Sequence, residues 1–534
     1  MATVAQVMAR RLRSAGCDVV FAYPGGEVLA VLDAVQAEGM RVVLAKHEAA
    51  AAFMAATYGG MTGRPGVCLA TLGPGATNLV SGVAHAYLDR CPVIAIAGQL
   101  KTDFQGIATH QYLDLNQLFA PITKWCQTVT AGNVGAVVDK AMRISLMGRP
   151  GPVLLQVPSD VAGAEAPVGH WSGGSARLLE GKGGGRTAYG VDPFALQNAG
   201  QLLTESHYPV LVAGLAAGPV ADAVRRFAET GGVPVVTTPK GKGVIPEDHL
   251  LSAGVMDVAF GSDQVRELLD QADLVLAVGL DASELMKPWA WDCPVIHIDR
   301  LPNIDCYYQA DVELAGDMAA GLRALAEGVR RFHWPEGIGS ETRQRVLAAI
   351  NPPGEGLSIT QALLQVRAGT PRAAIITCDV GAHKLAAGQT LPVYHPNSFL
   401  VSNGLSSMGY ALPAAVAAAL ARRDVPVLAL VGDGGLGMYL GELETIVREA
   451  LPVVVCVFID ETLSLIRIHQ DRRGLNHTAV KFQNPDLPAL ARAFGMTGLS
   501  AAGAGQLSAQ VAKAFNDGSP ALLAIPINEA RYPG

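Results

Sequence analysis

The chain has 534 residues, of which half are hydrophobic and 16% are charged, and its formal net charge is −7. This composition excludes a largely disordered protein, and the net negative charge argues against a nucleic-acid-binding protein. The eight cysteines form no Cys-x-x-Cys pair, which favours reduced thiols over disulfides or a zinc site. Because we find no signal-peptide pattern and no apolar run of membrane-spanning length, the sequence predicts a cytoplasmic α/β protein without membrane partners.

The first 165 residues alternate short β-rich runs with Ala-rich stretches, a pattern that is typical of parallel βαβ units. The expected strands lie at residues 18–22, 41–44, 66–70, 92–97 and 152–157, and a helix is expected over 49–57. Gly-rich turns follow the first and third of these strands, at residues 23–26 and 73–75. Parallel sheets bind ligands beyond the carboxyl ends of their strands, so both turns are candidate binding loops.

Two breaks divide the rest of the chain. A Gly-, Ala- and Ser-rich stretch over 162–187 indicates a weak linker, and Asn-Pro-Pro-Gly at 351–354 marks the second break. Buried strands are expected at 209–213, 233–238, 272–278 and 294–299, and then at 373–377, 426–431, 452–459 and 521–525. The sequence therefore predicts three doubly wound parallel-sheet domains, over residues 1–165, 190–345 and 355–534. The middle one is expected to be Rossmann-like, but it lacks the Gly-x-Gly-x-x-Gly motif of a nucleotide site.

A Gly-Asp-Gly-Gly turn at residues 432–435 follows the expected strand 426–431. Its glycines let the backbone approach an anion, but Asp433 would repel a phosphate unless a cation lay between them. Asp460 ends the next expected strand, and neighbouring parallel strands end at the same edge of a sheet. The two carboxylates therefore predict a Mg²⁺ site that bridges the protein and a phosphate. The alternatives are an ordinary strand-to-helix turn and, for Asp460, a helix cap, which is compatible with metal binding.

Glu48 follows the expected strand 41–44 and heads a run of apolar residues. A carboxylate among apolar neighbours is suited to proton transfer. The alternative is a solvated carboxylate that is stabilised by the N-terminus of its helix.

Three separated motifs resemble those of the thiamine-diphosphate-dependent enzymes, in the superfamily of acetolactate synthase and the 2-oxo-acid decarboxylases. They are Lys-His-Glu-Ala at 46–49, Thr-Leu-Gly-Pro-Gly-Ala-Thr-Asn at 71–78, and Gly-Asp-Gly at 432–434 followed by Asp460. Further matches lie at 23–26, 109–111, 122–124, 379–381 and 402–409. The resemblance covers essentially the whole chain, and it implies that the three domains are pyrimidine-binding, central and diphosphate-binding, in that order.

The resemblance implies thiamine diphosphate and Mg²⁺ as cofactors. Glu48 matches the carboxylate that hydrogen-bonds the pyrimidine. The residues that match the substrate side are Gly25, Gly26, His110 and Gln111. The expected metal ligands are Asp433, Asp460 and the carbonyl of Thr462. The residues expected to bind the cofactor are Pro24, Gly25, Glu48, Asn78, His383, Leu405, Met408, Gly432, Asp433, Gly434, Gly435 and Leu463. Met408 matches a residue that supports the bent cofactor, although a plain core methionine is the alternative.

The family resemblance also implies a reaction. A 2-oxo acid such as pyruvate is decarboxylated, and the resulting enamine is transferred to a second carbonyl, as in acetolactate synthase. One alternative is a decarboxylase or a 2-hydroxyacyl lyase that does not ligate, and another is a catalytically silent binding or regulatory relative. In favour of ligation, the chain has no His-His pair that could protonate the enamine.

Two features resemble the flavin-independent, catabolic synthases rather than the flavin-containing ones. Asp460 stands where most of the family has Asn, and the middle block lacks an Arg-Phe-Asp-Asp run, which argues against FAD. In this family the pyrimidine domain of one subunit faces the diphosphate domain of another. The resemblance therefore implies a homodimer or homotetramer with active sites between subunits.

Overall fold

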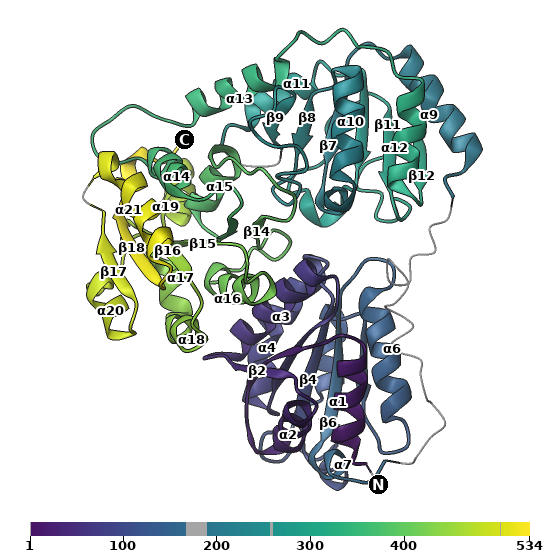
Figure 1. The fold of residues 1–534 in the computed structure, drawn as a ribbon, viewed down its shortest axis with the longest axis vertical. Coiled ribbons are helices and arrows are strands. Elements are labelled where there is room, and N and C mark those ends of the chain that lie inside the picture. The colour runs from purple at the N-terminus through teal and green to yellow at the C-terminus, as the bar shows by residue number, and fades with distance from the viewer. Residues whose placement is uncertain (1, 167–189, 257–259, 502, 534) are drawn as a thin grey trace. The chain divides into compact units, whose positions relative to one another are not determined.

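The computed structural model describes residues 2–166, 190–256, 260–501 and 503–533, and the predicted linker lies outside them from residue 167 onward. The described chain folds into three six-stranded sheets whose strands are all parallel, with helices on both faces (Figure 1). The predicted α/β class, with three doubly wound parallel-sheet domains, is therefore confirmed. In these residues no helix is both long and apolar enough to span a membrane. All eight cysteines are free thiols.

The first sheet has the strand order β2-β1-β3-β4-β6-β5. Its strands are β1 (Val19–Tyr23), β2 (Arg41–Leu44), β3 (Gly66–Ala70), β4 (Val93–Gln99), β5 (Trp125–Thr128) and β6 (Pro152–Pro158). Its helices are α1 (Val4–Ser14), α2 (Leu29–Ala37), α3 (Glu48–Thr62), α4 (Pro74–Leu88), α5 (Leu115–Phe119), α6 (Val134–Leu146) and α7 (Ser159–Ala162). The apolar sides of α1, α2 and α6 share one buried cluster with the strands, while α3 and α4 pack together against the same sheet.

The second sheet has the strand order β12-β11-β10-β7-β8-β9. Numbered within the domain, this order is 3-2-1-4-5-6 read from β9, so the predicted Rossmann-like topology is confirmed. The strands are β7 (Pro209–Ala213), β8 (Val235–Thr237), β9 (Ser252–Val255), β10 (Leu274–Val278), β11 (Val295–Asp299) and β12 (Val312–Ala315). The helices are α9 (Pro193–Glu205), α10 (Ala221–Gly231), α11 (Ser262–Leu269), α12 (Met318–Glu327) and α13 (Ile338–Ala349).

The third sheet, of order β14-β13-β15-β16-β18-β17, repeats the topology of the first. Its strands are β13 (Ile375–Cys378), β14 (Phe399–Val401), β15 (Val427–Gly432), β16 (Val453–Ile459), β17 (Thr497–Ser500) and β18 (Ala521–Pro526). The helices of this region are α14 (Ile359–Gly369), α15 (Ala382–Thr390), α16 (Ala411–Ala421), α17 (Asp433–Met438), α18 (Glu442–Arg448), α19 (Ser464–Arg472), α20 (Leu487–Ala493) and α21 (Ala504–Asp517). The two sheets that carry the predicted motifs thus share one strand order.

All thirteen strands expected from the sequence are present. The five strands that were not predicted are β5, β9, β12, β14 and β17, and each lies at the edge of its sheet. These five strands have only three or four residues, and four of them contain polar residues or glycine, so they lack the long apolar run of a strand buried on both faces. The sequence pattern therefore found the central strands and the edge strand β2, and missed the other five of the six edge strands.

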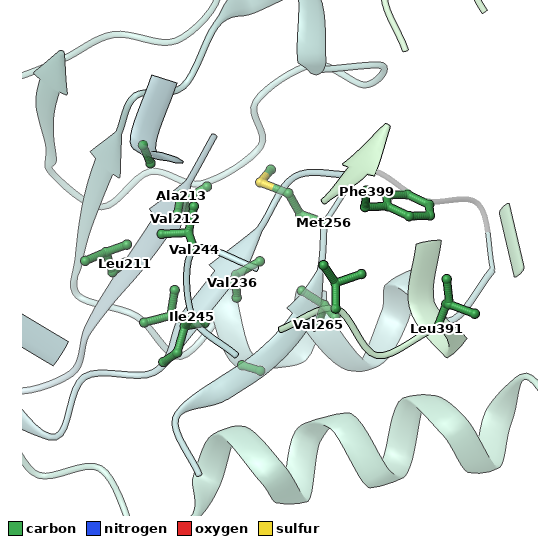
Figure 2. Close-up of a cluster of buried hydrophobic side chains, with 14 of the residues drawn as sticks. Leu211, Val212, Ala213, Val236, Val244, Ile245, Met256, Val265, Leu391 and Phe399 are labelled. Atoms are coloured by element: carbon green, nitrogen blue, oxygen red, sulfur yellow. The ribbon is translucent and has the colours of Figure 1, made fainter. Parts of the chain in front are cut away.

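The chain divides into two compact units that do not coincide with the three sheets. The first unit contains the first sheet together with Gly404–Arg423 and Met438–Leu451, which include α16 and α18. The second unit contains the other two sheets, and their apolar side chains form one continuous core. Figure 2 shows part of this core, where Leu391 and Phe399 from the third domain lie near Val236 and Val265 from the second.

Candidate active site

The candidate residues lie at corresponding edges of the first and third sheets. In both sheets the first strand of the domain is the neighbour of the third, so the chain leaves these two strands in opposite directions. Doubly wound sheets bind ligands at this switch point, beyond the carboxyl ends of the strands. The turns after β1 and β3 lie at the switch point of the first sheet, and Asp379 and Asp433 follow β13 and β15 of the third.

Glu48 is the first residue of α3 and is only 8% exposed. The side chain of Asn78 in α4 donates a hydrogen bond of 3.0 Å to its Oε2. The other oxygen, Oε1, accepts no hydrogen bond from the described residues and faces Gly75, where an added Cβ would lie 3.3 Å from it. The structure therefore brings together two predicted residues, Glu48 and Asn78, and leaves one oxygen of the carboxylate available for a ligand.

Close helix packing fixes the position of Glu48. Helix α3 is buried over most of its length because it packs against the sheet, α4 and α16, and its many alanines allow this close approach. A Cβ added at Gly82 of α4 would lie 2.4 Å from the Cβ of Ala52 and 2.7 Å from the carbonyl oxygen of Ala49. The two helices that carry Glu48 and Asn78 are therefore in contact through small residues.

A second carboxylate holds the turn before α3. Glu442, the fully buried first residue of α18, accepts a 2.7 Å hydrogen bond from the backbone N–H of Lys46. Burial raises the pKa of Glu442, whereas hydrogen bonds from Thr445 and from the backbone of Lys46 and His47 lower it. No local sequence pattern indicates this role, because Glu442 lies 396 positions after Lys46.

The turns after β1 and β3 are in contact with each other, and the second of them also lies next to Glu48. A Cβ at Gly25 would lie 2.5 Å from Thr71, and one at Gly73, which has a φ of +55°, would lie 2.9 Å from the Cβ of Gln111. The predicted residues Gly25 and Gln111 therefore lie at the same edge as the Thr71 loop. Glu27, which was not predicted, accepts a 2.6 Å hydrogen bond from Thr71 Oγ1.

Three other predicted residues at this edge make fewer contacts. Pro24 is exposed, and Gly26 begins a short helical turn with open space around its Cα. His110 is exposed and makes no hydrogen bond to the described residues. Pro24 stays a prediction for cofactor binding, and Gly26 and His110 stay predictions for the substrate side.

In the third sheet, Asp433 is buried at the start of α17, directly after β15. Its Oδ1 accepts a hydrogen bond from the N–H of Gly434 at 2.9 Å. Its Oδ2 accepts the N–H groups of Asp460 at 3.2 Å and Glu461 at 2.9 Å, and the side-chain amide of Asn484 at 2.8 Å. The adjacent ends of β15 and β16 thus bring Asp433 and Asp460 together, as the sequence predicted.

Asp460 also organises its own loop. Its Oδ1 accepts from the N–H of Thr462 at 3.1 Å, and its Oδ2 accepts from Ser464 at 2.6 Å and from the hydroxyl of Tyr532 at 3.0 Å. Burial raises the pKa of Asp460, and the charge of Asp433 raises it further. A divalent cation between the two carboxylates would relieve this repulsion. No group of three or more His, Cys, Asp or Glu side chains suited to a metal occurs in the described ranges, so further ligands would be carbonyl, phosphate or water oxygens.

His383 lies against the Gly-Asp-Gly-Gly turn. A Cβ at Gly432 would lie 3.0 Å from its imidazole ring, and one at Gly381 would lie 2.9 Å from it. Burial lowers the pKa of His383 to about 4, although a hydrogen bond with the backbone of Asp379 raises it. Its Nε2 is buried and has no hydrogen-bond partner among the described residues. This unpartnered nitrogen lies beside the glycine turn that is predicted to bind the diphosphate.

The remaining predicted residues lie in the first turn of α17 and in two loops. Gly434 and Gly435 form the first turn of α17, and Leu463 precedes α19 and donates its N–H to Val480 at 2.7 Å. Leu405 and Met408 are half-buried in the loop before α16, which belongs to the first unit.

Two basic side chains near these loops, Lys46 before α3 and Arg467 in α19, already have partners. Lys46 forms a 2.8 Å ion pair with Glu444, and Arg467 donates a 2.6 Å hydrogen bond to the carbonyl of Glu529.

Comparison with known proteins supports the resemblance along the whole chain. Models of the thiamine pyrophosphate enzyme family match the N-terminal TPP binding domain at residues 2–118, the central domain at 196–325 and the C-terminal TPP binding domain at 379–525. The large subunit of acetolactate synthase isozyme 2 from Escherichia coli is 32% identical over 537 residues, which cover 98% of this chain and 95% of that protein. Acetolactate synthase from Bacillus subtilis is 32% identical over 534 residues, with 96% and 91% covered. The chain therefore belongs to the thiamine pyrophosphate enzymes, in the acetolactate synthase family.

Proposed function

We propose that this protein is a thiamine-diphosphate- and Mg²⁺-dependent carboligase of the acetolactate synthase type, which decarboxylates a pyruvate-like 2-oxo acid and joins the remaining unit to a second carbonyl. The observation that carries this proposal is the pair of equivalent switch points, one with Glu48 and Asn78 and the other with Asp433, Asp460 and His383. The relatives named acetolactate synthase support this reaction over the alternatives of simple decarboxylation or a silent subunit.

Thiamine diphosphate supplies the carbanion chemistry and the electron sink for decarboxylation. Glu48 would hold a proton on its free Oε1 and exchange it with the pyrimidine, while Asn78 keeps Oε2 in place. Gly25, Gly26, His110 and Gln111 would line the substrate side, and Leu405 and Met408 would support the cofactor. The buried, Ala-rich environment of α3 keeps water away from Glu48.

The second switch point would bind the diphosphate. Gly432, Gly434 and Gly435 would let the backbone approach its oxygens beside His383, and Asp433, Asp460 and the carbonyl of Thr462 would hold Mg²⁺ against it. The cation would offset the charge of the two carboxylates, which otherwise repel a diphosphate.

We further propose that the central domain binds no FAD. A Rossmann sheet binds the phosphates of a dinucleotide at its switch point, which here lies between β7 and β10. At that point the buried carboxylate of Glu284 accepts the N–H of Leu215 at 2.9 Å and the N–H of Asp281 at 3.0 Å. An internal carboxylate therefore already uses the backbone donors that would bind a phosphate.

The proposal extends to the assembly and its location. Domains over 1–165, 190–345 and 355–534 would assemble into a cytoplasmic homodimer or homotetramer with active sites between subunits. The order of the matched family domains supports this organisation.

Incubation of the full-length protein with thiamine diphosphate, Mg²⁺ and isotopically labelled pyruvate tests the reaction, with carbon NMR of the products. We expect mainly the C–C-coupled 2-hydroxy-3-oxo acid and little free aldehyde. Acetaldehyde as the dominant early product would favour a decarboxylase. If pyruvate is not consumed, a panel of other 2-oxo acids identifies the donor, and inactivity with all of them contradicts the proposed function.

A further inference from the structure

The segment that follows β18 lies against the loop after β16, which carries two of the expected metal ligands. Ile527 donates its backbone N–H to the carbonyl of Ile459, the last residue of β16, at 3.0 Å. The chain then forms a short 3-10 turn, η6 (Glu529–Arg531), and reaches Tyr532. We call residues 527–532 the post-β18 segment. Two of its side chains contact the expected metal ligands.

The first of these side chains is Tyr532, which contacts the carboxylate of Asp460. Its hydroxyl donates to Asp460 Oδ2 at 3.0 Å, and the hydroxyl of Ser464 donates to the same oxygen at 2.6 Å. Among the described residues, the other oxygen, Oδ1, accepts only the N–H of Thr462, at 3.1 Å. A carboxylate oxygen has two lone pairs, so the two hydroxyls fill Oδ2 while Oδ1 keeps one acceptor position. Tyr532 and Ser464 therefore hold the carboxylate by one oxygen and leave the other able to bind a cation.

The second side chain is Glu529, which contacts the same loop two residues further along. The Thr462 hydroxyl shares its proton between Glu529 Oε2, at 2.8 Å, and the carbonyl of Asp460, at 3.1 Å. Arg467 of α19 donates to the Glu529 carbonyl at 2.6 Å, and its guanidinium lies 3.7 Å from Glu529 Oε1. Thr462 is buried, and its own carbonyl is the third expected metal ligand. Glu529 therefore holds this residue and α19 together.

The post-β18 segment is itself anchored to the start of the third domain. Asn528 donates its backbone N–H to the carbonyl of Leu357 at 2.9 Å. The guanidinium of Arg531, a buried residue, donates to the carbonyl of Pro352 at 2.7 Å. The two side chains that contact the metal loop therefore extend from a backbone that is fixed on both sides.

On these contacts, and resting on the proposed function, we propose that Tyr532 and Glu529 are positioning residues of the metal centre. Tyr532 orients the carboxylate of Asp460, and Glu529 orients the backbone of Thr462. Neither residue is a metal ligand, and neither contact moves a proton. Groups that hydrogen-bond metal ligands set the orientation of those ligands, so their loss weakens metal binding although every ligand remains.

Titration calorimetry of Mg²⁺ into the full-length protein with saturating thiamine diphosphate tests this role. Tyr532→Phe removes only a hydroxyl, so we expect it to fold and to weaken Mg²⁺ binding about 10–100-fold. The matched control is Tyr308→Phe. Tyr308 is a buried tyrosine of the second domain, and its hydroxyl lies 2.7 Å from His297 Nδ1. This control loses the same group away from the metal loop and should keep the Mg²⁺ affinity of the wild type.

The melting temperature separates positioning from a general loss of stability. Without Mg²⁺, Tyr532→Phe and Tyr308→Phe should both melt below the wild type, because each loses a hydrogen bond. The rise in melting temperature on adding Mg²⁺ should be smaller than that of the wild type only in Tyr532→Phe.

A pair of variants at Glu529 tests the second contact. Glu529→Gln keeps a side-chain oxygen for the Thr462 hydroxyl, whereas Glu529→Ala removes it. The backbone carbonyl that accepts from Arg467 is present in both. We therefore expect the glutamine variant to bind Mg²⁺ more tightly than the alanine variant.

Three results would overturn the inference. Wild-type Mg²⁺ affinity in Tyr532→Phe removes the role of Tyr532, and equal affinities of Glu529→Gln and Glu529→Ala remove that of Glu529. A Tyr308→Phe variant that binds Mg²⁺ as weakly as Tyr532→Phe would assign the effect to lost stability. Asp433→Ala separates these results from a failure of the proposed function. If that variant binds Mg²⁺ normally, the metal site itself is wrong, whereas its loss of binding beside an unaffected Tyr532→Phe rejects only the role of Tyr532.

Discussion

Glu48 shows how the residues around a carboxylate can leave one of its oxygens for chemistry. The hydrogen bond from Asn78 occupies Oε2, and Gly75 adds no side chain in front of Oε1. The N-cap of α3 is supplied by His47, whose Nδ1 accepts the N–H of Ala49. Glu48 is therefore not needed as a cap, and its carboxylate is available for proton exchange.

We predict that Glu48→Gln loses about 10²–10⁴-fold in turnover, because a positioned proton-transfer group contributes about that much. The neutral amide keeps the shape of the side chain and its contact with Asn78, so the fold and most cofactor binding should persist. Steady-state kinetics, with calorimetry of thiamine diphosphate binding as the control, provide the measurement. Turnover within a few-fold of the wild type would remove Glu48 from the mechanism.

Glu284 predicts a pH dependence of stability. Burial raises the pKa of Glu284 to about 7, although hydrogen bonds from Thr238 and from the backbone of Leu215 and Asp281 lower it. As the pH rises, the unfolded chain loses this proton near pH 4.5, whereas the folded protein keeps it until about pH 7. Its contribution to stability is complete below about pH 4.5, falls as the pH rises toward 7 and is constant above it.

We expect the melting temperature of the wild type to fall between pH 5 and pH 7.5 by more than that of Glu284→Gln. Glutamine cannot ionise, so the difference between the two slopes isolates Glu284 from other titrating groups. Differential scanning calorimetry at both pH values gives the measurement. Parallel curves for the two proteins would show that this carboxyl does not titrate in that range.

At the scale of elements, the contact between α3 and α4 sets the position of the Glu48–Asn78 pair. Gly82 allows α4 to approach α3 so closely that an added methyl group would overlap Ala52. Protein interiors are close-packed, so an overlap of this kind has to move a helix rather than a single side chain. Packing at Gly82 and geometry at Glu48 are therefore linked.

We predict that Gly82→Ala lowers the free energy of unfolding by about 1–3 kcal/mol, as overpacking of a core does. It should also lower activity, since Glu48 and Asn78 lie on the two helices that separate. The control is Gly60→Ala, because Gly60 is exposed in α3 and its added Cβ would meet only Cys91 Sγ, at 3.5 Å. There alanine should stabilise the helix by about 0.5–1 kcal/mol. Urea unfolding and kinetics of both variants test this, and equal effects of the two substitutions would contradict it.

At the scale of the whole molecule, the second and third sheets share one core, while α16 and α18 belong to the same unit as the first sheet. Residues far apart in the sequence, such as Glu442 and Lys46, therefore act together within one unit. The proposed arrangement adds a second chain, so that the Glu48 edge of one subunit faces the Asp433 edge of its partner.

Mixing two inactive variants tests that arrangement. We expect Glu48→Gln and Asp433→Ala to be inactive alone, and to recover about a quarter of wild-type activity after they are unfolded and refolded together. Random pairing makes half of the dimers mixed, and each mixed dimer has one intact site of two. If the refolded mixture contains mixed dimers by mass spectrometry but stays inactive, Glu48 and Asp433 do not meet across subunits.

The sequence by itself determined the fold class, the central strands of all three sheets and the motifs that identify the family. These signals are local, because a strand buried on both faces is a continuous apolar run and a binding turn is a short group of glycines. The pairing of Asp433 with Asp460 was also accessible, since adjacent parallel strands end at one edge of their sheet.

Only the tertiary structure decided the rest. The edge strands β5, β9, β12, β14 and β17 have only three or four residues, and their partners rather than their composition make them strands. Glu27, Glu442 and Asn484 have ordinary neighbours in the sequence, and each gains its place through a hydrogen bond to a residue from another element. Such contacts depend on where the folded chain brings two distant segments together, which no local pattern records.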